Sequence, residues 1–545
     1  MSKKLPGNAG CRTVNWLQFS FFIFSLVLSN AIPVLLFAQV TPLSKAKPIP
    51  GKENWQAAIP LPQQDKEAAD KLAGLKKKTG KKPNIIWFLI DDMGFGDPGF
   101  NGGGASIGAA TPNMDLLAAN GLKLTSTYSQ PTCTPTRSAI LTGRIPARTG
   151  LTRPILTGDK LTQNPWAGEV SLPKMLSESG YKTILSGKWH VGELEGMRPF
   201  DIGFDEYYGY YAAEKEISQE FDKRRYPDLV LDSFKLDAYH KTGASKDLVY
   251  GKKGGKEQLI KATKSVEDIA EADQMLKEFS IKKIREFAKS GEPFFLEHSF
   301  MKVHTDVWPS RKYEGKSSSK YPYKDGVVEV DAIIGEIMKE LEVNGMLENT
   351  FIFITSDNGP QMDAWPDAGY TPFRGTKGSA WEGGTRVPGV AYWKGMIKPR
   401  VSAELFDLMD LYNTTAFIGG AGDKIPTDMP IDGINQTGFL LADNGSSARD
   451  RVHTWVETQL VAIRLHEYKM YFYITESEDP HLMIDQSTIT KTGLAPWLYN
   501  LYIDPKESRV VGHAMNAWTA SLAAEAKYHA ASFVKFPPKN VGLGQ

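Results

Sequence analysis

The residue of this 545-residue chain with the most distinctive chemical setting is Cys133. The chain has only two cysteines, and the other, Cys11, lies in a segment typical of an export signal. If that segment is removed, Cys133 has no partner for an internal disulfide, and an unpaired thiol in an exported protein needs an explanation. An inert buried thiol is the ordinary alternative. Here, however, the cysteine begins a regular motif, Cys-x-Pro-x-Arg followed by Thr-Gly-Arg, with Pro135, Arg137, Thr142, Gly143 and Arg144.

The same motif predicts a helix that begins at Cys133. Pro135 is typical of the first turn of a helix, and Gly143 is typical of the position just after its end. Unpaired N–H groups and the helix dipole at such an N-terminus favour an anion and lower the pKa of a nucleophile. Arg137, one turn further along, could support that anion or the nucleophile itself.

Oxygen-bearing side chains follow two predicted strands at the point where each strand ends. They are Asp91 and Asp92 after residues 84–90, and Asp357 and Asn358 after residues 350–355. Ligands of open α/β sheets bind outside the carboxyl ends of the strands. An acidic pair after a strand is usually a solvated turn, but two pairs together with the Cys133 motif predict a site for Ca²⁺ or Mg²⁺, which prefer such ligands.

Further cationic and imidazole groups lie after other strands or in a glycine-rich loop. They are Lys188 and His190 in residues 187–192, His304 after the strand at 293–296, and Lys377 in residues 375–386. A single histidine or lysine in such a place is more often structural or simply exposed. In the company of Cys133 and the acids, these groups become candidates for the same site.

The pattern of apolar runs predicts an α/β fold. Continuous apolar runs at 84–90, 182–185, 293–296 and 350–355 alternate with helical patterns at 172–179, 266–288 and 328–343. This alternation indicates a large, mostly parallel sheet sandwiched by helices, in a domain of residues 84–445. We interpret 207–264 as an insertion over the sheet near the active site. Residues 446–545 predict a small α+β domain with an antiparallel sheet: a hairpin (460–464 and 469–473), a strand (497–502) and a helix (517–531).

The N-terminal region predicts export. Lysines and Arg12 precede an apolar run, which is typical of a signal peptide in residues 1–38. The alternative is an uncleaved membrane anchor, whereas cleavage would leave no stable membrane span. Residues 39–83, rich in proline and then lysine, predict a solvated linker. The net charge of +1 and the lack of aromatics among these lysines argue against nucleic-acid binding.

Taken together, these motifs resemble those of formylglycine-dependent sulfatases. The matching segments occur in the family order and span most of residues 83–400; they are residues 84–92, 133–144, 187–192, 203–205, 356–359 and 375–386. The resemblance implies an alkaline phosphatase-like fold with a small C-terminal antiparallel-sheet domain. It also implies hydrolysis of aryl or carbohydrate sulfate esters.

The resemblance further implies a role for each residue. Cys133 would become formylglycine (3-oxoalanine) through a formylglycine-generating enzyme and would lie at or near a Ca²⁺ ion, rather than Mg²⁺. The ion would be bound by Asp91, Asp92, Asp357 and Asn358. Arg137 would steady the formylglycine, Lys188 and Lys377 would hold sulfate oxygens, and His190 and His304 would serve the nucleophile and the leaving group.

Two other functions are compatible with parts of the pattern. A hydrolase of phosphate or phosphonate esters could use the same fold, metal and cations. A non-catalytic binder of sulfated glycans would lack a nucleophile or a metal ligand, and none is missing here. Export, together with the fold resemblance, suggests a periplasmic or secreted bacterial enzyme that acts on a sulfated polysaccharide or its oligosaccharides.

Overall fold

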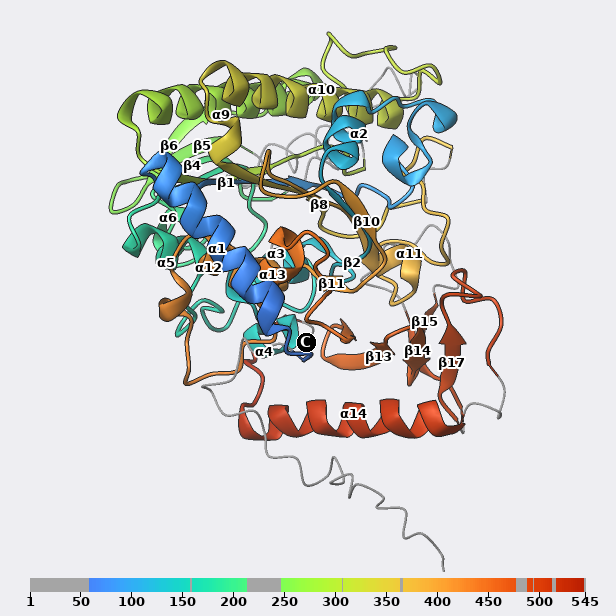
Figure 1. The fold of residues 1–545 in the computed structure, drawn as a ribbon. Helices are drawn as coiled ribbons and strands as arrows, with labels where there is room; N and C mark the ends of the chain where they lie inside the picture. The colour runs from blue at the N-terminus through green and yellow to red at the C-terminus, as the bar shows by residue number, and fades with distance from the viewer. Residues whose placement is uncertain are drawn as a thin grey trace, which may run out of the picture.

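The computed structural model describes residues 58–543, apart from 157–158, 213–246, 306, 363–365, 477–487, 494 and 512–515. Its centre is a sheet in the order β10-β2-β9-β8-β1-β7-β3-β4-β5-β6, with β11 also paired to β2 (Figure 1). The strands are β1 (Asn84–Ile90), β2 (Leu122–Tyr128), β3 (Lys182–Lys188), β4 (Glu206–Tyr210), β5 (Leu248–Lys252), β6 (Gln258–Lys261), β7 (Phe294–Ser299), β8 (Thr350–Ser356), β9 (Arg386–Tyr392), β10 (Arg400–Ser402) and β11 (Phe406–Asp407).

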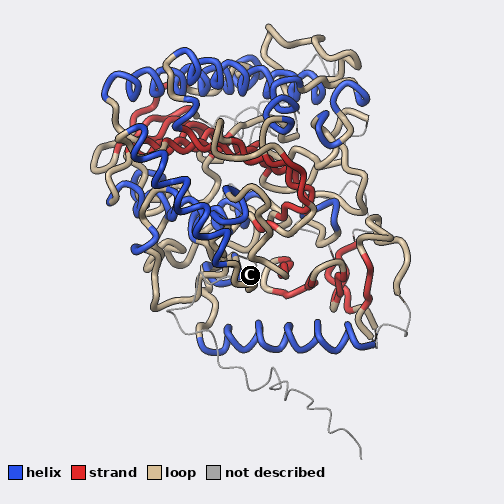
Figure 2. Tube along the Cα trace, in the orientation of Figure 1, coloured by secondary structure: helices blue, strands red, loops and turns tan. Residues whose placement is uncertain are grey.

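Helices cover both faces of this sheet, as Figures 1 and 2 show. On one face lie α2 (Pro112–Ala119), α9 (Ala272–Ser290) and α10 (Pro322–Val343). On the other lie α1 (Pro62–Thr79), α3 (Cys133–Thr142), α4 (Pro146–Thr149), α5 (Leu172–Glu178), α6 (Pro199–Ile202), α12 (Asp410–Ile418) and α13 (Thr437–Leu441). Shorter elements are α8 (Val266–Ala270), α11 (Glu382–Thr385) and the 3₁₀ turns Gly99–Asn101, Gly104–Ile107, Leu347–Asn349 and Gly422–Lys424.

The central strand β1 explains why its sequence is apolar throughout. Alternate residues point to opposite faces of a sheet. Ile85, Trp87 and Leu89 pack in the core on the α3 side, whereas Ile86, Phe88 and Ile90 pack in the core on the α10 side. The predicted α/β fold with a mostly parallel sheet between helices is therefore confirmed.

The segment expected to be a linker contains a helix, and for residues 62–79 that expectation is wrong. Helix α1 has Pro62 in its first turn and Gly80 in a left-handed conformation at its end. Ala68 and Leu75 are buried, and Leu72 packs against the same core. Their spacing of three to four residues forms one apolar stripe, which the surrounding lysines and prolines obscure in the sequence. The predicted signal peptide, residues 1–38, lies outside the described residues.

The segment 207–264 also differs from the interpretation as an insertion lying over the sheet. Its described parts, β4, β5 and β6, extend the edge of the main sheet beyond β3. Tyr207 and Tyr211 are buried in the core on the α5 side of the sheet, and Tyr210 is buried against Leu276 of α9. Residues 213–246 lie outside the described part.

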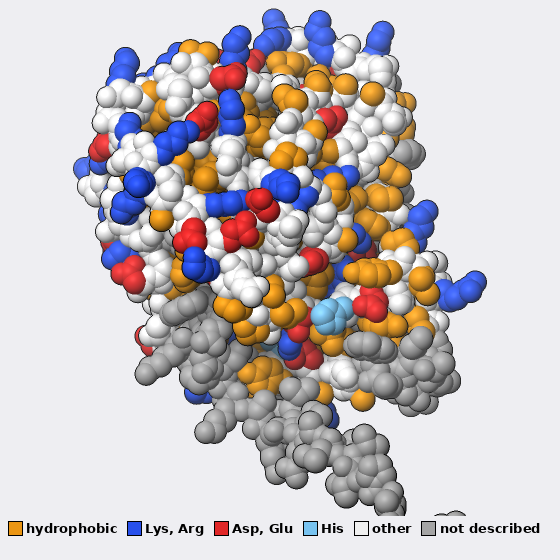
Figure 3. Space-filling view, in the orientation of Figure 1, with side chains coloured by type: hydrophobic (Ala, Val, Ile, Leu, Met, Phe, Trp, Pro, Cys, Tyr) orange, Lys and Arg blue, Asp and Glu red, His pale blue; other side chains and the backbone are white. Residues whose placement is uncertain are grey.

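A second, antiparallel sheet forms the C-terminal region, as predicted. Its order is β12-β13-β14-β17, and β15 pairs with β16 alongside. The strands are β12 (Arg451–Val456), β13 (Gln459–Leu465), β14 (Tyr468–Tyr471), β15 (Tyr473–Glu476), β16 (Thr488–Lys491) and β17 (Trp497–Asn500). Helix α14 (Asn516–Lys535) packs on this sheet. No helix in the described parts is both long and apolar enough to cross a bilayer. Figure 3 shows acidic and basic side chains interspersed over one face, as expected for a net charge of +1.

Candidate active site

Three carboxylates meet at the carboxyl ends of β1 and β8. These strands are parallel neighbours, with Ile90 opposite Ser356, so the residues that follow them lie side by side. One oxygen each from Asp91, Asp92 and Asp357 lies within 4.8 Å of the other two, and all three residues are buried. Oδ1 of Asp91 and Oδ1 of the adjacent Asn358 accept no hydrogen bond from the described residues. Buried oxygens without donors are the ligand chemistry of a hard divalent cation.

The backbone at this point is strained. Asp92 has a φ of 61°, a left-handed conformation that is uncommon for a residue other than glycine. Its N–H donates to Asp357 Oδ1 at 3.1 Å, and its own Oδ1 accepts from Asn358 Nδ2 at 2.7 Å. These bonds hold the carboxylate cluster in a conformation that the local sequence disfavours.

Cys133 is the first residue of α3, as the motif predicts. The helix ends at Gly143, whose φ is 67°. The Cys133 Sγ is buried and lies 3.2 Å from His190 Nδ1. The other ring nitrogen, Nε2, lies 3.0 Å from the carbonyl oxygen of Ile155, which can only accept a hydrogen bond. We therefore assign the proton to Nε2, which leaves the lone pair of Nδ1 directed at residue 133.

Arg137 joins the helix to the acidic cluster. Its Nε and NH2 donate to Asp357 Oδ2 at 3.0 and 2.8 Å, and its NH1 donates to the carbonyl of Lys188 at 2.9 Å and to Ser299 Oγ at 2.5 Å. The guanidinium is 1% exposed, and burial of an arginine requires this degree of pairing. Ser299 was not predicted from the sequence. Its position at the end of β7, beside β1 and β3, is the signal that could have identified it.

Two lysines neutralise the other carboxylates. Lys188 Nζ donates to Asp91 Oδ2 at 2.7 Å, and Lys377 Nζ donates to Asp92 Oδ2 at 2.8 Å. Lys377 Nζ also lies 3.1 Å from His304 Nε2, while His304 Nδ1 lies 2.5 Å from the carbonyl of Thr305. All ten predicted site residues thus come together in one buried constellation, with three cations facing three carboxylates.

The pKa shifts follow from this crowding. Burial raises the pKa of Asp91, but Lys188 and the other cations around it outweigh burial and hold the pKa well below its usual value. Burial lowers the pKa of Lys377, but the Asp92 and Asp91 carboxylates outweigh it and raise the pKa above its usual range. Burial raises the pKa of the Cys133 thiol and, together with Lys188, lowers the pKa of His190. Lys377 therefore stays positively charged, and His190 is neutral at pH 7.

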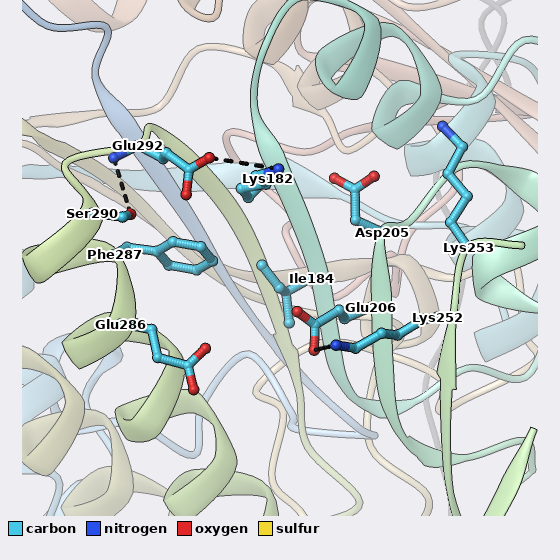
Figure 4. Close-up of a pocket in the computed structure, with 10 residues that line it drawn as sticks. All are labelled: Lys182, Ile184, Asp205, Glu206, Lys252, Lys253, Glu286, Phe287, Ser290 and Glu292. Carbon is cyan, nitrogen blue, oxygen red and sulfur yellow. Dashed lines mark hydrogen bonds and ion pairs between the residues drawn. The ribbon is translucent and has the colours of Figure 1, made fainter. Parts of the chain in front are cut away.

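A separate pocket of about 470 Å³ lies at the opposite end of the strands (Figure 4). It is lined by the first residues of β3 and β4 and by the end of α9, among them Lys182, Glu206 and Phe287. Two ion pairs join residues of its lining, Lys182 with Glu292 and Lys252 with Glu206. The six residue steps of β3 from Lys182 to Lys188 place it about 20 Å from the acidic cluster. It contains none of the predicted site residues.

Comparisons with known proteins agree with this geometry. A sequence model of the sulfatase family matches residues 83–420. The chain is 32% identical over 404 residues to N-acetylgalactosamine-6-sulfatase of Canis lupus familiaris, covering 72% of each chain. It is 29% identical over 493 residues to human arylsulfatase A, covering 86% of this chain and 92% of that one. The crystal structure of the PsFucS1 sulfatase from Pseudoalteromonas sp. superposes with a TM-score of 0.84 at 48% identity, covering 89% of this chain and 97% of that chain.

The family match covers more than half of the chain and contains every residue of the constellation described above. The fold is accordingly that of the alkaline phosphatase superfamily, as the sequence motifs implied. This chain belongs to the sulfatase family and is a sulfuric ester hydrolase.

Proposed function

We propose that this protein hydrolyses sulfate esters of carbohydrates at Cys133, converted to formylglycine, beside a Ca²⁺ ion held by Asp91, Asp92, Asp357 and Asn358. The observation that carries this proposal is the placement of Cys133 at the N-terminus of α3, hydrogen-bonded to His190 and linked through Arg137 to the three carboxylates.

The residues present fit a divalent cation. Asp91 Oδ1 and Asn358 Oδ1 are buried oxygens that accept no hydrogen bond from the described residues, and three carboxylates supply the charge. The donor set consists only of oxygens, which suits Ca²⁺ or Mg²⁺ rather than a softer metal. Ca²⁺ tolerates irregular, fully protein-derived ligand sets better than Mg²⁺ does, and this favours Ca²⁺. Such an ion polarises a sulfate oxygen and lowers the pKa of the nucleophile.

Cys133 Sγ marks where the oxygens of the mature nucleophile would lie. A formylglycine hydrate supplies two hydroxyls on one carbon, one to attack sulfur and one to release sulfate afterwards. The Nδ1 lone pair of His190 faces this position and can accept a proton from it. The helix N-terminus favours negative charge at the same place.

The charges of the site favour an anionic substrate. Arg137, Lys188 and Lys377 balance Asp91, Asp92 and Asp357, so a bound divalent cation leaves a buried excess of two positive charges. Lys188 and Lys377 would then turn from the carboxylates to the sulfate oxygens and stabilise the charge spread over them. His304, beside Lys377, would donate a proton to the leaving alcohol.

The substrate class rests on the relatives. N-acetylgalactosamine-6-sulfatase acts on a sulfated sugar by its name, and it shares 32% identity with this chain. Maturation would require a formylglycine-generating enzyme, and the predicted signal peptide supports export to the periplasm or the medium.

The test is the mass of the tryptic peptide of residues 124–137, from protein produced together with a formylglycine-generating enzyme. The expected peptide carries CHO in place of CH₂SH, and the protein releases sulfate from sulfated mono- and oligosaccharides and from 4-nitrophenyl sulfate. Cys133→Ala, folded to the same melting temperature, should be inactive. An unmodified Cys133 in fully active protein would refute the nucleophile. Faster turnover of phosphate or phosphonate esters than of every sulfate ester would favour the rival hydrolase.

A further inference from the structure

The loop that carries Lys377 is held from its far side by the C-terminal sheet. Residues 375–385 run from the active site to α11, which lies against that sheet (Figure 1). Lys469 Nζ, from β14, donates to the carbonyl of Ala380 at 2.8 Å and to Glu382 Oε1 at 2.9 Å. Lys469 and Glu382 are both at most 1% exposed. Glu382 Oε2 also accepts from Arg386 NH1 at 3.3 Å, and Lys469 Nζ lies 3.7 Å from Glu507 Oε1, so the pair belongs to a buried network of opposite charges that compensate one another.

A tryptophan of the same loop, Trp381, packs against side chains of the C-terminal sheet. The Trp381 ring packs against Tyr471 and Tyr499, with centroids 4.5 and 6.0 Å away, and the Arg374 guanidinium covers it at 3.7 Å. The indole Nε1 donates to the carbonyl of Thr475 at 3.1 Å, and Thr475 Oγ1 accepts from the N–H of Ala380 at 3.0 Å. Both backbone groups of Ala380 are therefore bound by side chains of the C-terminal strands β14 and β15.

Glu507 forms hydrogen bonds with Arg374, which precedes the loop, and with Glu382 near its end. Its Oε2 accepts from the N–H of Glu382 at 2.8 Å, and its carbonyl accepts from Arg374 NH1 at 3.1 Å. The side chain of Glu507 is fully buried and also contacts the Tyr471 hydroxyl. The loop is thus fixed at residues 374 and 380–382, on either side of Lys377.

The middle of the loop faces the nucleophile and the metal ligands. The N–H of Lys377 donates to the carbonyl of Pro360 at 3.0 Å, two residues from Asn358. The N–H of Gly378 donates to the carbonyl of Pro131 at 2.7 Å, two residues from Cys133. A shift of the loop would consequently move Lys377 Nζ relative to both groups between which it must act.

We propose that the C-terminal sheet sets the position of Lys377, with Lys469 and Glu507 as positioning residues for sulfate turnover. This inference rests on the proposed role of Lys377 in holding sulfate oxygens. A misplacement of about 1 Å at a reacting group can cost about 100-fold in rate. Loss of the Lys469 contacts to Ala380 and Glu382 should therefore reduce kcat about 10- to 100-fold, although Lys469 touches neither substrate nor metal ligand.

The test is a double-mutant cycle between Lys469→Met and Lys377→Ala. Two quantities are measured on formylglycine-containing protein: kcat on 4-nitrophenyl sulfate, and the Kd of inorganic sulfate by titration calorimetry. Lys469→Met should lower kcat about 10- to 100-fold when Lys377 is present, and less than about twofold in the Lys377→Ala background. Equal losses in both backgrounds, or no loss in either, would overturn the inference.

Two further variants separate positioning from loss of stability. Met470→Ala removes a buried side chain on the same strand that packs toward α14, on the face away from the loop. It should lower the melting temperature as Lys469→Met does, yet retain kcat within about twofold. An equal loss of kcat there would mean that general loosening of the sheet is responsible. Thr475→Val, which removes only the bond to the Ala380 N–H, is the milder substitute if Lys469→Met does not fold. If Lys377→Ala alone keeps the wild-type kcat and sulfate affinity, the proposed role of Lys377 fails, with the sheet intact.

Discussion

Replacement of Lys188 by methionine should strengthen Ca²⁺ binding while it removes most of the turnover. The Lys188 ammonium lies 2.7 Å from Asp91 Oδ2, and both side chains are fully buried. Lys188 therefore occupies a carboxylate oxygen of the predicted metal site, and its charge repels any cation that binds there. Methionine fills a similar volume with neither charge nor hydrogen-bond donor.

Two contributions, both favourable, set the expected gain in Ca²⁺ affinity of Lys188→Met. At an effective dielectric constant of about 20, one positive charge about 5 Å from a divalent cation is repelled by about 6–7 kcal/mol. In the metal-free variant, Asp91 also loses a buried partner, which costs about 3–5 kcal/mol and is offset when the metal binds. Protonation of Asp91 and relaxation of Arg137 and Lys377 offset much of the sum. Even about a quarter of the repulsion corresponds to roughly 10- to 20-fold tighter Ca²⁺ binding.

The assay is calorimetric titration of chelator-treated protein with Ca²⁺ at pH 7.5, paired with kcat at saturating Ca²⁺. We expect at least about tenfold tighter binding and a fall in kcat of about 100-fold or more, because a cation that stabilises the developing charge is lost. The matched control is Lys283→Met, a largely buried lysine paired with Glu206 at the far end of the strands, which should leave Ca²⁺ affinity unchanged. Unchanged or weaker Ca²⁺ binding in Lys188→Met would refute the assignment of Asp91 as a ligand with which Lys188 competes.

Three further outcomes follow from particular contacts. His190→Ala should lower kcat about 10²- to 10⁴-fold with little change in melting temperature, since it removes the base facing residue 133; a loss below about tenfold would exclude that role. Leu75→Ala in α1 should cost about 2 kcal/mol of unfolding free energy in denaturant titration, against less than about 0.5 kcal/mol for the exposed Leu116→Ala. Burial and the neighbouring His453 lower the pKa of His529 in the folded protein. As the pH falls below about 6.5, this histidine is protonated in the unfolded chain before it is protonated in the folded one, and the free energy of unfolding decreases by up to about 1.4 kcal/mol per pH unit. His529→Phe should flatten the melting temperature between pH 6.5 and 5, and an unchanged slope would contradict this.

The sheet could be predicted because its strands are buried on both faces. Such strands leave continuous apolar runs, and β1, β7 and β8 were found in this way: the bounds of β1 and β8 agree within one residue, whereas β7 ends three residues later than predicted. The acidic cluster was found because the ends of β1 and β8 carry polar groups, and parallel neighbours bring those ends together. Cys133, Arg137 and Lys377 were instead found from local sequence motifs. The features that were predicted well are thus those set by a few consecutive residues, together with the general rule that ligands bind at the carboxyl ends of parallel strands.

Helix α1 and the contacts between the C-terminal sheet and the Lys377 loop could not be predicted, for a different reason. The stripe of Ala68, Leu72 and Leu75 is narrow, and its burial depends on a surface supplied by α13 and the turn that follows β9. The pair of Lys469 and Glu382 joins residues 87 positions apart, and neither belongs to a recognisable local pattern. Each contact becomes favourable only after the partner surface exists, so the local sequence carries no sign of it.

The two site residues with the least favourable backbone show how these distant contacts serve the chemistry. Asp92 and His190 have φ values of 61° and 60°, and both follow a strand end directly or within two residues. Each is held by bonds from elsewhere in the fold: the Asp92 N–H by Asp357, and the His190 backbone by Tyr211 and Thr134 at 2.7 and 2.6 Å. A relaxed backbone would swing the carboxylate away from Asn358 and the imidazole away from Cys133. The strain of about 1–3 kcal/mol at each residue is therefore maintained by the sheet, the helix α3 and β4 together, and the site is assembled only when the whole α/β domain is folded.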